Sequence, residues 1–243
     1  MEISFKSKRA LVTGAERGIG KEIAKQLVKF GAEVVALSLN KEPLEQLARE
    51  VNVTTIAVDL SDWDKTREAV KSVGPIDLLV NNAGVVSLNA FLDIKPEEFD
   101  STFAVNVKPI INVSQVVVEG MVKRKTGGSI VNISSQASQA ALLNHTVYCA
   151  SKAAVDQITK VMAVELGPHN IRVNTVNPTV VLTEMGRFAW RDPEKASKML
   201  SEIPLGKFAE VEDIVNAVLF LLSDKAAMVN GITLPVDGGF LAR

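Results

Sequence analysis

The sequence predicts a single α/β domain in which a doubly wound sheet of seven parallel strands fills the chain. Three observations predict it. Seven short runs rich in β-branched residues alternate with helix-length segments along the whole sequence. The runs carry few alternating polar residues, as strands do when helices cover both faces of their sheet. No Pro-, Gly- or Ser-rich linker divides the 243 residues, so one domain over 1–243 is expected.

The expected strands cover residues 9–13, 33–37, 54–58, 77–80, 129–133, 171–176 and 232–235. Between them, apolar residues recur at three- and four-residue spacing, as at Ile19, Ile23, Leu27 and Phe30 after the first strand. Because consecutive parallel strands are joined by crossovers, these segments are expected to be helices that cover the sheet. This pattern is typical of a Rossmann-like domain, whose ligands bind beyond the carboxyl ends of the strands.

One segment, 178–208, departs from this alternation between the sixth and seventh strands. It contains Pro178, Pro193 and Pro204, and the aromatic residues Phe188 and Trp190. Insertions are tolerated beyond the carboxyl ends of the strands, next to the ligand. We interpret the 178–208 segment as a lid over a substrate site. The alternative is an ordinary excursion of two helices and a turn.

Composition and charge argue against several kinds of partner. With 27 basic and 28 acidic residues the net charge is −1, which gives no global attraction to nucleic acid or to an anionic membrane. The longest apolar run, 217–222, is far shorter than the roughly 18 residues of a membrane span, and no signal peptide is readable. A single cysteine, Cys149, excludes an intrachain disulfide and a multi-cysteine metal site. We expect a cytoplasmic protein without a bound metal.

A glycine-rich turn, Thr-Gly-Ala-Glu-Arg-Gly-Ile-Gly at 13–20, follows the first expected strand. Its glycines, Gly14, Gly18 and Gly20, would let the backbone turn tightly and approach a pyrophosphate at the start of a helix. The spacing differs from the common G-x-G-x-x-G fingerprint, and a glycine cluster alone could be a structural turn. Its place in the first strand–helix unit favours a dinucleotide site.

Further motifs occur in the order found in the short-chain dehydrogenases/reductases, and the chain resembles that family over essentially its whole length. They are Asp59-Leu60, the run Asn-Asn-Ala-Gly at 81–84, Asn106, Ser135, Tyr148 with Lys152, Asn177-Pro178 and Thr183. Narrower similarity at 144–148, 177–181, 203–213 and 234–240 points to the dicarbonyl/L-xylulose reductase branch. The resemblance implies an oxidoreductase that uses a nicotinamide dinucleotide.

Tyr148 is the only tyrosine of the chain, and Lys152 lies one helical turn beyond it. A phenol with an ordinary pKa near 10 is a poor acid at neutral pH, but an adjacent ammonium and a cationic nicotinamide should lower that pKa. Tyr148 is therefore expected to be the proton donor. A solvated tyrosine–lysine pair on a helix surface is the alternative for an isolated pair.

The resemblance assigns roles to three further groups. Ser135 is expected to polarise the substrate carbonyl, and its spacing from Tyr148 selects it over its neighbour Ser134. Lys152 would also hold the ribose hydroxyls. Asn106 is expected to interrupt its helix and to hold a water that relays protons toward the lysine, and a structural hydrogen bond to backbone is the alternative for its side chain.

The residues expected near the adenine ribose and its 2′-phosphate favour NADPH over NADH. No acid stands at the end of the second strand, in Ser38, Leu39 and Asn40, to bind the ribose 2′-hydroxyl of NADH. Arg17 could reach a 2′-phosphate, although similar proteins often carry a second arginine at the position of Leu39, so use of both cofactors stays open. The expected cofactor contacts are Gly14, Arg17, Gly18, Ile19, Gly20, Ser38, Leu39, Asn40, Asp59, Leu60, Asn82, Ala83, Gly84, Tyr148, Lys152, Pro178, Val181 and Thr183.

By the same resemblance, the substrate pocket is expected to contain Ser135, Gln136, Leu142, Asn144, His145 and Trp190. His145 could be proposed as a general base, but we favour a role in lining the pocket. Cys149 is interpreted as a small packed residue in preference to a redox group.

The expected reaction is hydride transfer from NADPH to a small ketone or α-dicarbonyl of the L-xylulose or diacetyl type. A 3-oxoacyl-thioester reductase shares the same residues and is the enzymatic alternative. A dinucleotide-binding scaffold or redox sensor is the non-enzymatic one. A homotetramer is also expected. Strand 232–236 would form a sheet edge and the tail 240–242 is apolar, and the resemblance implies that this edge and two long helices, about 96–123 and 148–166, pack against neighbouring subunits. Folding of that tail onto its own subunit is the alternative.

Overall fold

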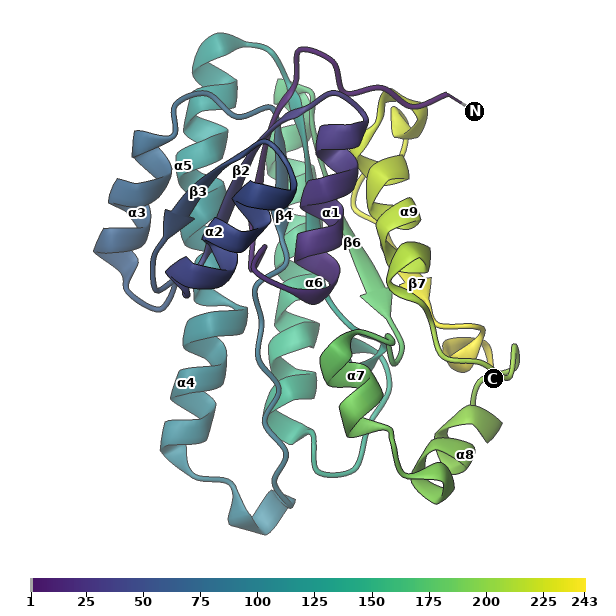
Figure 1. Cartoon of the computed structure of the whole chain (residues 1–243). Helices are drawn as coiled ribbons and strands as arrows, with labels where there is room; N and C mark the ends of the chain where they lie inside the picture. Colours follow the sequence, from purple (N-terminus) through teal and green to yellow (C-terminus); the bar gives the residue numbers. More distant parts are fainter. Residues whose placement is uncertain (1) are drawn as a thin grey trace.

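The computed structural model describes residues 2–243 and contains one sheet of seven parallel strands (Figure 1). The strands are β1 (Arg9–Thr13), β2 (Glu33–Ser38), β3 (Val53–Ala57), β4 (Leu78–Asn81), β5 (Gly128–Ile133), β6 (Ile171–Pro178) and β7 (Thr233–Val236). All seven predicted strands form. The bounds of β1 are as predicted, and the ends of the other six differ by at most two residues. The largest difference is in β6, which continues to Pro178 because Asn177 and Pro178 pair with β7.

The sheet order is β3-β2-β1-β4-β5-β6-β7. The chain therefore builds outward from β1 on one side and then returns to add β4 on the other. Such a reversal leaves a crevice at the carboxyl ends of β1 and β4, where dinucleotides bind in doubly wound folds. As predicted, β7 lies at an edge of the sheet.

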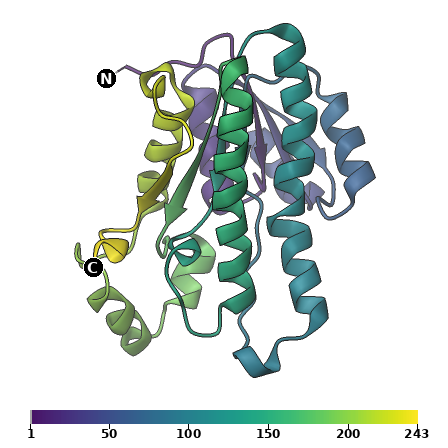
Figure 2. The ribbon, with the colours of Figure 1, turned by 180° about the vertical axis from the view of Figure 1, so that it is seen from behind.

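Helices cover both faces of the sheet (Figures 1 and 2). One face carries α1 (Gly18–Lys29), α2 (Lys41–Glu50) and α9 (Val211–Leu222), and the other carries α3 (Trp63–Ser72), α5 (Lys108–Arg124) and α6 (Thr146–Leu166). Successive strand side chains point to opposite faces. Val12 accordingly packs with Leu27 of α1, whereas its neighbour Leu11 packs in the second core with Met121 of α5.

Three helices extend past the carboxyl ends of the strands, in the lower part of Figure 1: α4 (Pro96–Asn106), α7 (Glu184–Ala189) and α8 (Pro193–Ser201). The helix expected over 96–123 is two helices, because the backbone leaves helical geometry at Val107, where φ is −117°. The interruption directly after Asn106 agrees with the resemblance. Both short helices of the 178–208 segment belong to this layer.

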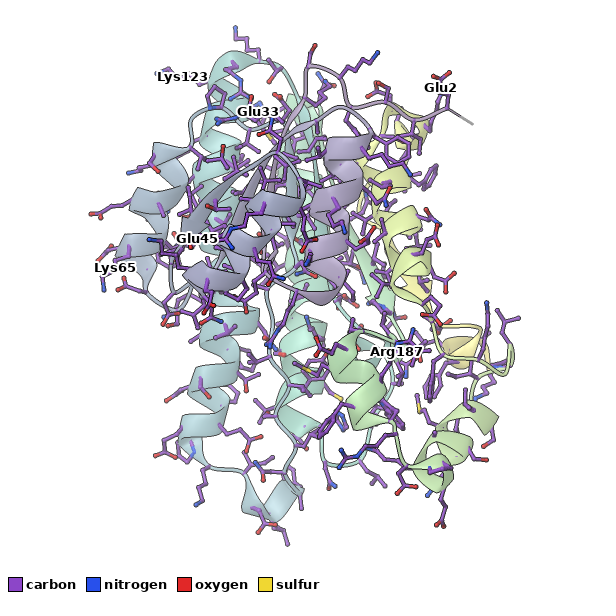
Figure 3. The ribbon with its side chains drawn as sticks, viewed as in Figure 1. Glu2, Glu33, Glu45, Lys65, Lys123 and Arg187 are labelled. Carbon is purple, nitrogen blue, oxygen red and sulfur yellow. The ribbon has the colours of Figure 1, made fainter. Side chains whose placement is uncertain are left out.

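The 178–208 segment is attached to the body by specific contacts. Arg187 on α7, labelled in Figure 3, forms an ion pair of 2.9 Å with Glu210 at the start of α9. The rings of Trp190 and Phe208 lie 5.4 Å apart. At the carboxyl end of the chain, the backbone N–H of Leu205 donates to the carbonyl of Gly238. Gly238 precedes the apolar tail 240–242, and the packing of that tail, on its own subunit or on a neighbouring one, stays a prediction.

None of the helices within residues 2–243 is long and apolar enough to cross a membrane.

Candidate functional site

The glycine turn joins β1 to α1 in a conformation that needs glycine. Gly14 and Gly18 have φ of +64° and +55°, in the left-handed region that other residues rarely adopt. A Cβ on Gly20 would lie 2.3 Å from the carbonyl oxygen of Gly14, so no side chain fits there. Arg17 precedes α1 without capping it by its side chain, which leaves the first N–H groups of α1 free of a side-chain acceptor. The turn fits a pyrophosphate.

The neighbouring strand braces this turn. The Thr13 hydroxyl accepts the backbone N–H groups of Asn82 at 3.0 Å and of Ala83 at 3.2 Å. The Asn82 amide donates to the carbonyls of Thr13 and Gly14, both at 3.0 Å. The predicted Asn82–Gly84 contacts therefore lie beside the turn, and Asn82 is used to hold it in shape.

Other predicted cofactor residues surround the same crevice. Thr183 lies next to the turn, since its methyl group would be 3.2 Å from a Cβ on Gly18. The Thr183 hydroxyl accepts the Gly186 N–H at the start of α7. The Asp59 carboxylate accepts hydrogen bonds from the backbone and hydroxyl of Ser61. Leu60 is buried. Thr183 thus lies at the glycine turn, whereas the cofactor contacts expected of Asp59 and Leu60 stay predictions. The side chains of Thr183 and Asp59 are each committed to a local hydrogen bond.

A carboxylate whose role the sequence reasoning missed lies against the residue Asn40, which follows β2. Glu16, in the glycine turn, accepts hydrogen bonds from the backbone N–H and the side-chain amide of Asn40, each at 3.1 Å. Arg17 is well exposed, and its Nε lies 3.9 Å from the Glu16 carboxylate. Leu39 is exposed, whereas Ser38 is buried. In the sequence, the position of Glu16 directly before Arg17 in the 13–20 turn could have indicated this carboxylate.

The four predicted catalytic residues come from three elements that meet at one place. Ser135 follows β5, Tyr148 and Lys152 lie on α6, and Asn106 ends α4. The Lys152 ammonium donates to the carbonyl of Ile133 at 2.8 Å and lies 5.8 Å from the centre of the Tyr148 ring.

Gly84 brings the end of β4 to the same cluster. A Cβ there would lie 3.4 Å from the Asn106 side-chain oxygen and 3.5 Å from Lys152 Nζ. The glycine crevice and the catalytic cluster are therefore continuous.

Asn106 is fully buried and tied to protein groups. Its side-chain oxygen accepts the Val85 N–H at 2.8 Å, and its amide donates to the Val85 carbonyl at 2.9 Å and to the Ser151 hydroxyl at 3.1 Å. The structural hydrogen bond to backbone, weighed above as the alternative for this side chain, is thus present. The relay water stays a prediction.

The pKa of the Tyr148 phenol shifts in the direction opposite to that predicted from the neighbouring lysine. Burial raises it, a hydrogen bond with Ser135 lowers it by less, and the nearby Cys149 raises it further. The prediction of a lowered pKa is therefore wrong for the protein without a bound nicotinamide. Desolvation of the phenolate raises the pKa by more than the hydrogen bond with Ser135 lowers it. The phenol consequently keeps its proton at neutral pH, which is the form that a proton donor needs.

Burial lowers the pKa of the Lys152 ammonium to about 8, and the negative charge of Asp156 raises it in part. Asp156 lies one helical turn beyond Lys152 and is itself buried. An acid at this spacing in the printed sequence was a signal that the sequence reasoning did not use.

A buried network fixes the turn that carries Ser135. The side-chain amide of Asn177, at the end of β6, donates to both Asp156 oxygens at 3.1 and 3.0 Å. The same amide lies 3.2 Å from the Ser135 carbonyl and 2.9 Å from the Ser138 hydroxyl. Asp156 and Asn177 therefore connect α6 and β6 to the 135–138 turn.

The predicted substrate residues occupy two regions. Gln136 is buried beside Ser135, and the oxygen of its side-chain amide, Oε1, has no hydrogen-bond partner within residues 2–243. His145 directly precedes α6. Its Nδ1 lies 2.6 Å from the Leu143 carbonyl oxygen, and its ring lies 6.1 Å from that of Tyr148. Leu142 and Asn144 lie in the loop that leads into α6. Trp190 instead packs against Phe208 in the 178–208 segment.

Across residues 2–243, His, Cys, Asp and Glu side chains do not gather in any group of three or more that could hold a metal ion.

Similarity to known proteins agrees with this arrangement. Residues 14–241 match the model of a protein family described as enoyl-(acyl carrier protein) reductase. The chain is 56% identical to an L-xylulose reductase of Bos taurus over 243 residues, which cover 100% of both chains. It is 49% identical to carbonyl reductase (NADPH) 2 of Sus scrofa, again over 100% of both chains.

A solved structure with the same fold is that of a gluconate 5-dehydrogenase from Burkholderia cenocepacia in complex with NADP and tartrate. It has a TM-score of 0.94 and 32% identity and covers 99% of this chain and 97% of its own.

Proposed function

This chain belongs to the short-chain dehydrogenase/reductase family, and we propose that it reduces a small ketone or α-dicarbonyl of the L-xylulose or diacetyl type to an alcohol with NADPH. The observation that carries the proposal is the meeting of Ser135, Tyr148 and Lys152 at the end of a crevice whose other end is the glycine turn. Similarity to an L-xylulose reductase supports the substrate class, and similarity to a carbonyl reductase named for NADPH supports the cofactor.

The residues present fit a dinucleotide. A Cβ would fill the cradle at Gly20, and the start of α1 has no side-chain cap to compete with a phosphate. The bound cofactor supplies the hydride. Gly14, Gly18 and the α1 amides would hold the pyrophosphate, and Lys152 would hold ribose hydroxyls.

The protein groups then manage the proton and the developing charge. Tyr148 holds a proton at its phenol oxygen and gives it to the alkoxide that forms when the carbonyl carbon is reduced. The Ser135 hydroxyl donates a hydrogen bond to the carbonyl oxygen, which stabilises that charge. Asn106 keeps the 85 loop in place, and the 178–208 segment would cover the substrate and exclude water.

A thioester reductase is the second candidate, because the matching family model is described by an acyl-carrier-protein substrate. The two are separated by assaying NADPH consumption with L-xylulose, diacetyl and a short 3-oxoacyl thioester, each with NADH as well. Turnover of the small carbonyls supports the proposal. Efficient turnover of the thioester alone would replace it, and binding of NADPH with no turnover of any carbonyl would favour a scaffold or sensor.

Arg17→Ala is expected to weaken NADPH much more than NADH, by roughly 10-fold or more, because only NADPH carries the additional phosphate that a guanidinium can pair. Dissociation constants measured by cofactor fluorescence test this. Leu39→Arg should raise NADPH affinity in the same assay. Equal losses for both cofactors would mean that Arg17 shapes the turn and does not bind the phosphate.

We also propose a homotetramer in the cytoplasm. Val164 and Val161 on α6 are 77% and 46% exposed, and Ile111 on α5 is 38% exposed, so an apolar surface runs along the two long helices. Such surfaces mark association sites. The lone thiol of Cys149 is consistent with a reducing compartment.

Light scattering should give about four times the 26.2 kDa chain mass, and Val164→Glu should lower it, because a carboxylate would be buried in the contact. A native protein that is monomeric at micromolar concentration rules the assembly out. Deletion of residues 239–243 tests the tail separately. A deletion variant that stays tetrameric would show that the interface does not need the tail, and it would leave the rest of the assembly proposal intact.

A further inference from the structure

The carboxylate of Glu16 lies where NADPH and NADH differ. Its two oxygens accept the Asn40 backbone and side-chain N–H groups at 3.1 Å, and Asn40 follows β2, whose carboxyl end faces the ribose in doubly wound folds. The turn itself is held against the same strand, because the Ala15 N–H donates to the Leu37 carbonyl. Glu16 thus brings a negative charge from the glycine turn to a strand end that has none of its own.

This charge is fixed in place. The Glu16 side chain is only 10% exposed, against 71% for Arg17. Arg17 Nε lies 3.9 Å from a Glu16 carboxylate oxygen, so the guanidinium expected to bind a 2′-phosphate already faces an anion. Leu39, exposed beside them, adds no second cation. A phosphate arriving here would meet the Glu16 carboxylate beside the Arg17 guanidinium, so its attraction to Arg17 is reduced.

We propose that Glu16 sets the cofactor selectivity of this enzyme: its carboxylate opposes the 2′-phosphate of NADPH and accepts a hydrogen bond from the 2′-hydroxyl of NADH. A carboxylate oxygen offers about two acceptor positions, so the bonds to Asn40 leave room for a hydroxyl. The chain therefore uses NADH more readily than Arg17 alone would allow. This inference rests on the proposed function, since it presumes that the crevice binds nicotinamide dinucleotides.

Glu16→Gln tests the proposal because the amide keeps the size of the side chain and one acceptor but removes the charge. We expect the dissociation constant of NADPH to fall at least about threefold and that of NADH to stay the same or rise. Both constants are measured by cofactor fluorescence, without substrate. The gain for NADPH should shrink as salt is added, because it is electrostatic.

Glu45→Gln is the matched control, since Glu45 is an exposed acid on α2 (Figure 3) that pairs with Lys41 at 3.4 Å. It removes the same charge from the helix that follows Asn40 and should leave the ratio of the two constants within twofold. If Glu16→Gln behaves like this control, or weakens both cofactors together, Glu16 only fastens the turn and the inference is wrong. If the unmodified protein binds neither cofactor, the proposed function itself fails.

Discussion

Tyr148→Phe should leave NADPH binding largely unchanged and lower carbonyl reduction at least roughly 100-fold. The substitution keeps the ring and removes only the hydroxyl, so the packing of α6 and the crevice stay intact. The alkoxide then has no protein proton at the place where charge develops. The effect is expected to fall on turnover, because we expect the glycine turn and Lys152, and not the Tyr148 hydroxyl, to hold the cofactor.

The measurement is single-turnover reduction of diacetyl by bound NADPH, with cofactor affinity measured in parallel. Cys149→Ser is the control, since Cys149 is the next residue of α6, and it should keep turnover within a few-fold of the unmodified protein. A Tyr148→Phe enzyme that turns over at a comparable rate would reject Tyr148 as the acid. A variant that loses NADPH affinity as well would show that the hydroxyl also holds the cofactor.

The sheet could be predicted from the sequence because its information is local. Each strand is a short apolar run, and strand ends shifted by at most two residues. The resemblance also predicted the break after Asn106, where one periodic segment became α4 and α5. Membership of the family followed from the order of short motifs, each of which lies within a few residues of the chain.

The contacts that shape the site could not be predicted from local sequence patterns, because they join residues far apart in the sequence. Glu16 and Asn40 are 24 residues apart, and Asp156 and Asn177 are 21 apart. Nothing in the local pattern says that these side chains meet. The direction of the Tyr148 pKa shift was wrong for a related reason: spacing on a helix shows that a lysine is near, but desolvation depends on everything that packs around the phenol.

Lys152 extends this argument from catalysis to stability. Its ammonium is buried, and burial lowers its pKa to about 8 from the ordinary 10.5, with Asp156 opposing the shift. The folded state therefore binds this proton more weakly than the unfolded state does. The buried ammonium therefore lowers the free energy of unfolding, and this loss is fully present below about pH 8. Between about pH 8 and 10.5 Lys152 is protonated mainly in the unfolded chain, so the loss becomes smaller as pH rises through this interval.

Lys152→Met is accordingly expected to lower turnover at least roughly 100-fold while removing a pH dependence of folding. Between about pH 7.5 and 9.5 the free energy of unfolding of the unmodified protein should gain more than that of the variant, by an amount on the order of 1 to 2 kcal/mol. The window stops there because the raised pKa of Tyr148 acts in the opposite direction above pH 10, the ordinary value for its phenol.

Urea unfolding of the cofactor-free protein at several pH values measures this difference, and Lys160→Met, at an exposed position of the same helix, is the control that should follow the unmodified protein. The comparison uses pH slopes because Lys152→Met also leaves the Ile133 carbonyl without its donor and Asp156 without its neighbouring ammonium, which shifts stability at every pH. Parallel slopes for Lys152→Met and the unmodified protein would show that the ammonium is solvated as readily in the folded as in the unfolded state, and burial would then not be what prepares this lysine for the site.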